Sequence, residues 1–223
     1  MSSTRFAILI PWAPTAWSAS GRLAGRTPLS LTADGRKSAL VWAQELVAHR
    51  PAVVVASSEQ ASSETSQIIA EFHKARRRVV SELKEIDVGL WEGLTADELS
   101  RRYPKVYKRW KEEPLGVCPP EGENLNDAGS RLQAAIESVC EKAGQNLPAI
   151  VLAPLAFRLA RRLLERGNGG QVPELSVQAG PVVYRRMETN GSGGSDTDLE
   201  TFNPVLEIGA IGTSTEQERA ESE

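Results

Sequence analysis

Three short runs of apolar residues, each followed by a segment with helical periodicity, constrain the fold of this chain most strongly. The runs are Phe6–Ile10, Val53–Val55 and Ala149–Leu152. Strand and helix signals that alternate in this way favour crossover units, whose strands lie parallel in one sheet. The sequence therefore predicts an α/β fold built on a mainly parallel sheet.

Helices are predicted between these strands from apolar spacing and from residues that begin or end helices. Thr32 can cap the first of them, because its hydroxyl can accept a hydrogen bond from a first-turn amide. Tyr103-Pro104 is expected to end a helix that begins at Thr95, because the residue before a proline avoids helical angles. The predicted helices span about 32–48, 59–75, 95–103, 126–144 and 155–166, and Arg76–Arg78 is placed at the end of the second. Further extended segments are expected at 79–83, 175–177 and 182–184.

The chain divides by charge into a basic body and an acidic tail. Its 223 residues fit one large domain more easily than two small ones. From Glu188 onward there are nine acidic residues and one basic residue, so the tail carries −8 and residues 1–187 carry +5 of the net −3. The Gly/Ser-rich run Asn190–Asp196 has the composition of a linker, and the polar, acidic Thr213–Glu223 that of a disordered segment. We therefore predict one domain at 1–187, and a linker with a disordered tail at 188–223.

Several function classes are disfavoured by composition. The two cysteines, Cys118 and Cys140, form neither a disulfide framework nor a metal-binding pattern, and Cys140 falls on the apolar stripe of a predicted helix. No signal-peptide pattern and no run long enough to span a bilayer is found, so we expect a cytoplasmic protein. Arg76–Arg78 is short and lacks aromatic neighbours, which disfavours nucleic-acid binding. We expect no metal, no cofactor, no membrane and no nucleic-acid partner.

The loop after the first strand lacks the residues that catalysis would need there. Pro11-Trp12-Ala13-Pro14 follows the strand at the place where an α/β enzyme presents its chemistry. None of these side chains can act as a nucleophile, a general base or a phosphate ligand, and prolines lack the backbone N–H that could hold an anion. The predicted α/β arrangement around this loop is typical of an enzyme, whereas the residues of the loop are not.

Blocks of sequence in a fixed order relate the chain to a known family. The blocks are Pro11–Thr15 followed by Trp17, then Gly21–Arg26, Leu29–Arg36, Leu83–Gly93 and Pro120–Asn124. Together they resemble the histidine phosphatase superfamily, the phosphoglycerate mutase-like proteins, over roughly residues 5–186. Leu83–Gly93 matches that family's Leu-x-Glu-x-x-x-Gly-x-Trp-Glu-Gly block. The resemblance implies a three-layer α/β/α sandwich with a mainly parallel sheet and, because dimers are common among relatives, a possible homodimer.

The resemblance also locates the family's catalytic groups, most of which this chain lacks. In the family, a histidine at the end of the first strand is the nucleophile, and two arginines and a second histidine bind the phosphoryl group. The nucleophile corresponds to Trp12, its neighbouring arginine to Pro11 and the second histidine to Pro154. The second arginine belongs in the segment 57–65, which contains no arginine. A missing nucleophile alone can reduce turnover on the order of 10^6-fold, so the resemblance implies a degenerate site.

The family's proton-donating glutamate has a counterpart, Glu85. It is a candidate remnant proton donor, although retention of its block for packing, with Trp91 in the core, is the favoured interpretation. Arg22 and Arg26 are candidate anion-binding residues at the mouth of the old pocket, and they fit equally well as ordinary loop arginines. Trp12 is expected to project into that pocket, where it either fills the space or lines an apolar groove.

Three functions remain open from the sequence. The leading hypothesis is a catalytically dead member of the superfamily that binds an unidentified protein partner. The alternative is an active phosphomonoester hydrolase or mutase with relocated residues, using Glu85 as acid or base with Glu59 or Glu64 and a loop arginine. The third is a structural role in which the acidic tail binds a basic partner in a salt-dependent way.

Overall fold

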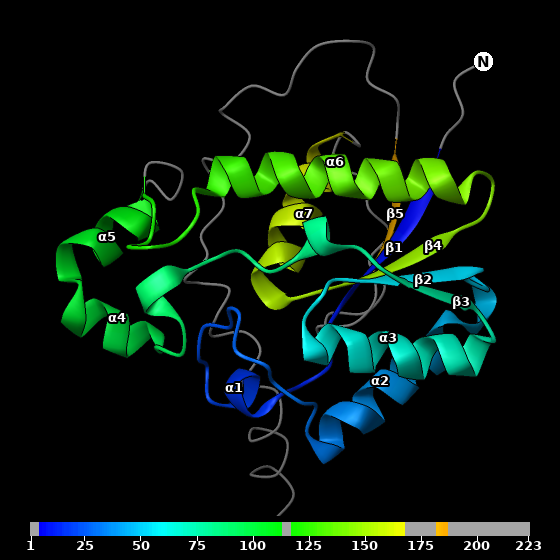
Figure 1. Cartoon of the computed structure of the whole chain (residues 1–223), viewed down its shortest axis with the longest axis horizontal. Helices are drawn as coiled ribbons and strands as arrows, with labels where there is room; N and C mark the ends of the chain where they lie inside the picture. Colours follow the sequence, from blue (N-terminus) through cyan, green and yellow to red (C-terminus); the bar gives the residue numbers. More distant parts are fainter. Residues whose placement is uncertain (1–4, 113–116, 168–181, 187–223) are drawn as a thin grey trace, which may run out of the picture.

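In the computed structural model, which describes residues 5–112, 117–167 and 182–186, a five-stranded sheet forms the centre of the chain (Figure 1). The strand order is β3-β2-β4-β1-β5. Four strands are parallel, and β5 pairs antiparallel with β1. The strands are β1 (Arg5–Pro11), β2 (Val53–Ala56), β3 (Arg76–Val79), β4 (Pro148–Leu152) and β5 (Val182–Arg186).

Helices cover both faces of the sheet, which confirms the three-layer α/β/α architecture with a mainly parallel sheet. α2 (Ala33–Glu45) and α3 (Gln60–His73) lie on one face, and α6 (Leu125–Ala143) and α7 (Pro154–Gly167) on the other (Figure 1). The remaining helices are α1 (Ala16–Ala19), α4 (Ala96–Arg102), α5 (Pro104–Glu112) and the short 3-10 turns η1 (Leu46–Ala48), η2 (Ser81–Leu83) and η3 (Gly89–Trp91).

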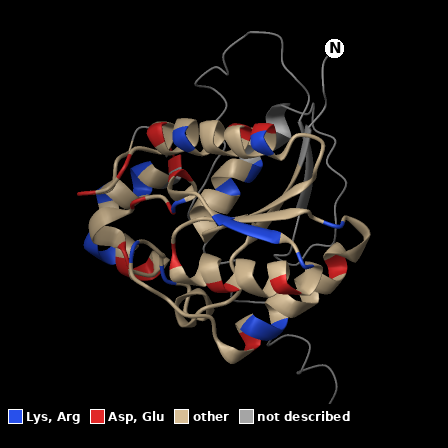
Figure 2. Cartoon of the chain, turned by 45° about the vertical axis from the view of Figure 1, so that its right-hand side comes forward, with Lys and Arg blue, Asp and Glu red and all other residues tan. Residues whose placement is uncertain are grey.

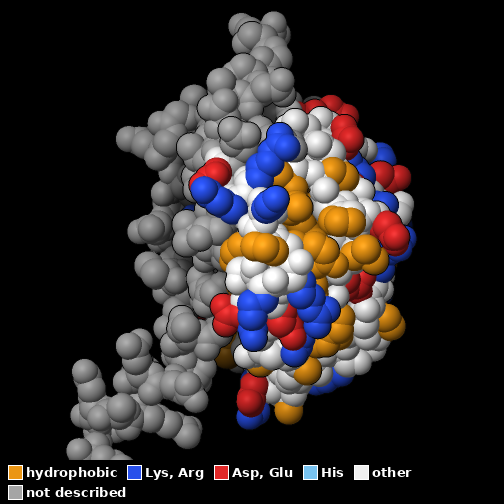
Figure 3. All heavy atoms as spheres, turned by 90° about the vertical axis from the view of Figure 1, so that its left-hand side faces the viewer, with side chains coloured by type: hydrophobic (Ala, Val, Ile, Leu, Met, Phe, Trp, Pro, Cys, Tyr) orange, Lys and Arg blue, Asp and Glu red, His pale blue; other side chains and the backbone are white. Residues whose placement is uncertain are grey.

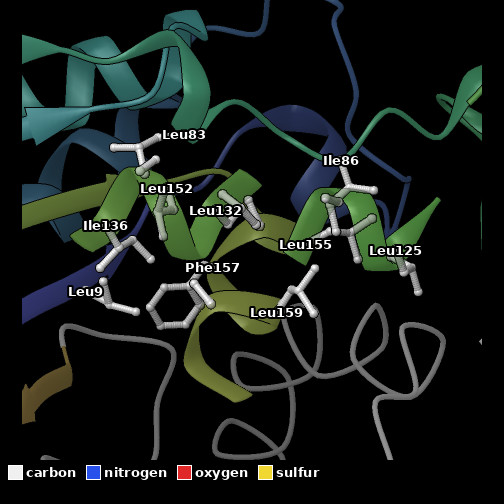
Figure 4. Close-up of a cluster of buried hydrophobic side chains, with 14 of the residues drawn as sticks. Leu9, Leu83, Ile86, Leu125, Leu132, Ile136, Leu152, Leu155, Phe157 and Leu159 are labelled. Atoms are coloured by element: carbon white, nitrogen blue, oxygen red, sulfur yellow. The ribbon is translucent and has the colours of Figure 1, made fainter. Parts of the chain in front are cut away.

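The alternation of side chains along the strands divides the core into two layers. Ile8 and Ile10 face α2 and α3, whereas Leu9 between them faces α6 and α7. On the α6–α7 side, Leu9 and Leu152 of the sheet pack with helix side chains that include Leu132, Ile136 and Phe157 (Figure 4). Each buried strand therefore contributes to both layers, as expected for a parallel sheet covered on both faces.

The predicted helix boundaries at 32, 95 and 144 are confirmed by their caps. The hydroxyl of Thr32 accepts a hydrogen bond from the Gly35 amide at 2.9 Å. Thr95 and Glu98 form a reciprocal capping box at the start of α4. Gly144 ends α6 with a positive φ of 62°, a conformation that glycine adopts easily. Cys140 is buried on the inner face of α6, as predicted.

The prediction that Arg76–Arg78 lies at a helix end is wrong. α3 ends at His73, Lys74 turns the chain with a φ of 52°, and the arginines form the edge strand β3, which pairs with β2. The extended segment expected at 79–83 lies correspondingly earlier, and Ser81–Leu83 forms η2. Strand pairing overrides the charged composition here, because the side chains of this edge strand are exposed.

A helix was missed after Pro104. α4 ends at Arg102, as the Tyr103-Pro104 pair predicted, but Pro104 then begins α5 as its first residue. Proline is well tolerated at that position, because the first helical N–H has no partner within the helix. On the face that carries α4 and α5, hydrophobic side chains lie among charged ones (Figure 3). Val106 of α5 is 36% exposed.

The remaining predictions on the C-terminal part of the chain are tested only where the structure describes it. The extended segment at 182–184 is confirmed as part of β5. The segment 175–177, the linker 190–196 and the tail 188–223 lie outside the described residues, so the domain division at 187 stays a prediction. No helix in the described part of the chain is both long and apolar enough to cross a bilayer.

Candidate functional site

The loops that follow β1, β2 and β4 meet at the carboxyl edge of the sheet, where parallel α/β folds bind their ligands. Pro11 pairs with Leu152 at the ends of β1 and β4, and Ala56 pairs with Val151 at the end of β2. The structure thereby brings together three of the positions that the family resemblance singled out: Pro11, Trp12 and Pro154.

Trp12 fills space at this edge with its indole. It is 4% exposed, and within the described residues its indole N–H has no hydrogen-bond partner. The backbone amides beside it are occupied, since Trp12 donates to the Leu152 carbonyl at 2.8 Å and Ala13 donates to the Thr65 hydroxyl at 2.9 Å. The loop therefore offers an anion neither a cationic side chain nor a free amide at these positions.

A hydrogen bond between two serine hydroxyls joins the loop after β2 to the first turn of α3. Ser57 donates to Ser62 at 2.7 Å, and both residues are fully buried. Ser62 lies in the segment where the family resemblance expects the second arginine. Its site is already packed, so the segment provides polar groups that bind each other and no positive charge.

Among the described residues, this edge holds a small cavity of about 30 Å³, lined by residues that include Trp12, Ser18, Arg22, Pro154 and Arg158. A volume of this size accommodates only one or two water molecules. Trp12 therefore both fills and lines space at this edge, because its indole is buried and also forms one wall of this small cavity.

Glu85 is buried and caps α7 next to Leu155, which lines this cavity. Its Oε2 accepts a hydrogen bond from the Leu155 amide at 2.9 Å, and its Oε1 accepts from the amides of Ala156 and Ile86 at 2.7 and 2.8 Å. Pro154, the first residue of α7, has no N–H to donate. The N-terminus of a helix is a natural anion site, and at α7 it is occupied by the carboxyl group of Glu85.

The ionisation of Glu85 is strongly perturbed. Burial raises the pKa of Glu85 to about 8, against the effect of its three backbone N–H donors, and the nearby carboxylate of Glu59 raises it further. Glu59 precedes α3, and its Oε1 accepts from the Glu85 amide at 2.6 Å. Its other oxygen is buried with no hydrogen-bond partner among the described residues.

In the hypothesis of an active hydrolase, Glu59 is therefore the acidic residue that lies next to Glu85, whereas Glu64 makes its contacts elsewhere. Glu64 forms an ion pair with Arg36 at 2.6 Å and accepts from Gln60, on the side of α3 that faces the loop before α2. The structure pairs Glu85 with Glu59 and assigns Glu64 to contacts within the α2–α3 layer.

The two candidate arginines differ in position. Arg22 lines the small cavity, but its guanidinium donates to the Gly93 carbonyl at 2.6 Å and pairs with Glu98 at 3.1 Å. The side chain of Arg26 is 82% exposed, and it lies 3.8 Å from the Asp87 carboxylate. Arg26 is not among the described residues that line the cavity. Their role in anion binding stays a prediction.

Sequence reasoning missed the residues that hold the Glu85 loop in place. Arg131 of α6 donates to the carbonyls of Glu82 and Lys84 at 2.7 and 3.0 Å, and it pairs with Glu123 at 2.5 Å. Glu123 also accepts from the Asp87 amide at 2.9 Å. The Pro120–Asn124 block was the available signal, since it marked this segment without showing what Glu123 would contact.

Comparison with known proteins agrees with the architecture and the sequence blocks. The family model for the histidine phosphatase superfamily (branch 1) matches residues 8–193. Phosphoserine phosphatase 1 of Hydrogenobacter thermophilus is 32% identical over 151 residues, which cover 68% of this chain and 72% of that protein. A protein named probable phosphoglycerate mutase GpmB, from Yersinia enterocolitica, is 26% identical over 67% of this chain and 69% of its own length.

Solved structures support the same fold. YhfR of Bacillus stearothermophilus superimposes with a TM-score of 0.67 at 24% identity and covers 72% of this chain and 80% of its own. A structure named mycobacterial hydrolase 1 gives a TM-score of 0.66 at 20% identity, with 74% and 82% of the two chains covered. The chain therefore belongs to the histidine phosphatase superfamily.

Proposed function

We propose that this chain is a pseudoenzyme of the superfamily and acts by binding a protein partner rather than by phosphoryl transfer. The observation that carries the proposal is the small volume of the pocket, together with the Glu85 side chain at the N-terminus of α7. Trp12 and Pro154 wall a cavity of about 30 Å³, and Glu85 occupies the N-terminus of α7. The identity of the partner, the homodimer and the cytoplasmic location remain predictions from the sequence.

Charge supports the proposal independently of volume. A phosphoryl group is held by charge-assisted hydrogen bonds, commonly from arginine. Of the two arginines that line the cavity, Arg22 is paired with Glu98, and the neighbouring buried carboxyls of Glu59 and Glu85 supply no positive charge. A phosphate monoester is larger than this cavity and would have to displace the side chains that wall it, such as the indole of Trp12.

One observation favours the alternative, an active hydrolase that uses Glu85 as its acid. Glu85 and Glu59 are neighbouring carboxyls, and the raised pKa of Glu85 is a property of catalytic acids. Against it, the three hydrogen bonds that the Glu85 side chain accepts all come from backbone amides, and the described residues that line the cavity do not include Glu85. Structural ion and cap positions also shift pKa values, so the pseudoenzyme is the better-supported proposal.

The test is phosphate release by the purified chain over a panel of phosphomonoesters from acid to neutral pH. We expect no release above the buffer control, with the Hydrogenobacter phosphoserine phosphatase assayed in parallel as the positive control. Reproducible turnover would contradict the proposal. If Glu85→Gln then removed the turnover, the alternative would be supported instead.

A variant of this chain tests whether the missing residue types explain the expected lack of phosphate release. It carries Pro11→Arg, Trp12→His, Ser62→Arg and Pro154→His, which restore the residue types expected from the family resemblance. Ser62 is fully buried and Trp12 nearly so, and circular dichroism must therefore show that this variant folds before its activity is compared. Phosphate release by the folded variant alone would assign the loss of activity to these four positions.

A further inference from the structure

A groove of about 670 Å³ lies between α6 and the strands β2 and β3, and its lining shares no residue with the cavity beside Trp12. Its floor is apolar, because the side chains of β2 that face α6 are valines and the facing helix surface is made of small residues. The floor residues are Val53, Val55, Val80, Ala134, Ala135, Val139 and Ala143. A groove of this kind binds an extended segment that carries apolar side chains.

The rim of the groove is cationic. Arg76 and Arg78 stand on β3 and Lys142 on α6, with Glu82 as the acidic residue among the groove's lining. β3 is visible as a basic strand at the sheet edge in Figure 2. Arg77 points to the opposite face of the sheet, where it donates to Ser66 and Ser63. Within the described residues, neither Arg76 nor Arg78 forms an ion pair, so both guanidinium groups are available to an acidic ligand.

One segment of the chain itself has the matching composition. Residues 196–207 contain four acids, Asp196, Asp198, Glu200 and Glu207, and no Lys or Arg. Interspersed with them are the apolar residues Leu199, Phe202, Val205 and Leu206. This segment lies outside the described residues. Its acids suit the rim, and its apolar side chains suit the floor.

The sheet topology brings the start of the tail to the right edge. β5 ends at Arg186, which pairs with Arg5 at the first residue of β1. The parallel strands β2 and β3 begin at this same edge, where Val53 pairs with Arg76. β5 and β3 are four strand positions apart, about 19 Å at the usual strand spacing.

The linker is long enough to cover that distance. Residues 187–196 include the Gly/Ser-rich run Asn190–Asp196, and a flexible chain of about ten residues has a root-mean-square span of roughly 16–19 Å. A segment tethered by a linker that matches the span experiences an effective concentration on the order of millimolar. Even a weak groove site is then occupied within one molecule.

We propose that residues 196–207 of this chain bind in the groove between α6 and β2–β3. The acidic side chains pair with Arg76, Arg78 and Lys142, and the apolar side chains, led by Phe202, cover the floor at Val53 and Val139. The inference is independent of whether the cavity beside Trp12 is active, because it uses none of the residues of that cavity.

The test is zero-length carbodiimide cross-linking of the full chain at low protein concentration, followed by peptide mass spectrometry. The reagent joins an amine to a carboxyl in contact, and Lys142 is the amine in the groove. We expect an intramolecular link from Lys142 to an acid within 196–207 at low salt. Arg76→Glu with Arg78→Glu should reduce its yield about tenfold or more, since two ion pairs are lost and two repulsions gained. High salt should reduce it as well.

Matched variants separate specific docking from general attraction. Lys105→Glu with Lys108→Glu on α5 changes the net charge equally, and we expect it to leave the yield unchanged. Phe202→Ser should reduce the yield without changing any charge. Circular dichroism confirms that each variant folds. The proposal is overturned if the Lys142 link is absent, if both charge-reversal pairs act alike, or if the link forms only between two copies in a concentration-dependent manner.

Discussion

Glu85→Ala is expected to lower the free energy of unfolding by about 3 kcal/mol or more. The substitution removes the acceptor of three buried backbone amides, those of Ile86, Leu155 and Ala156. A buried donor left without a partner costs about 1–3 kcal/mol. Glu85 is 4% exposed, so water cannot replace the lost acceptor without disturbing the packing. Urea denaturation at pH 6, followed by circular dichroism, measures the change.

Two further variants serve as comparisons for the loss of stability expected in Glu85→Ala. Glu85→Gln keeps one side-chain carbonyl as an acceptor but turns an amide N–H₂ towards a backbone donor, and it should lie between wild type and alanine. Glu45→Ala, at the exposed end of α2, should change stability by no more than about 0.5 kcal/mol. If Glu85→Ala behaved like Glu45→Ala, the carboxyl would not be the cap of α7.

Much of the fold could be predicted from the sequence, because its signals are local. The buried strands are short apolar runs, and the caps at Thr32 and Thr95 depend on residues three positions apart. β3 could not be predicted in this way, since Arg76–Arg78 is a strand only because β2 lies beside it. α5 was missed because a proline that ends one helix can also begin the next.

The sequence predicted which catalytic residue types are missing from the candidate site, but it did not predict the hydrogen bonds within that site. Trp12 and Pro154 were identified as non-catalytic from residue type alone, and the structure brings both to one cavity. The role of Glu85 as the cap of α7 joins residues about 70 positions apart, and Arg131 reaches the Glu85 loop across about 47 positions. Hydrogen bonds over such separations follow from the packing of layers, which the sequence does not show.

The second large effect is expected in the pH dependence of stability. The pKa of Glu85 is raised to about 8 in the folded chain, from an ordinary value of 4.5. Between these values the folded state binds more protons than the unfolded state, so stability is greatest at low pH and falls as the pH rises. Each unit of pKa difference corresponds to about 1.4 kcal/mol, and we expect a loss of about 3 kcal/mol between pH 5.5 and pH 9.

The difference between wild type and Glu85→Gln isolates this effect, because glutamine does not titrate. The stability advantage of the wild type should decrease by about 3 kcal/mol over that pH range. The pKa of Glu92 is lowered by its hydrogen bonds from Thr27, despite partial burial, and its contribution is lost only below about pH 4.5, outside this window. A wild-type advantage that did not change with pH would mean that the three amides outweigh burial and keep Glu85 ionised. Glu85 would then cap α7 as a carboxylate, and the helix N-terminus would hold a full negative charge where a phosphate group would otherwise have to bind.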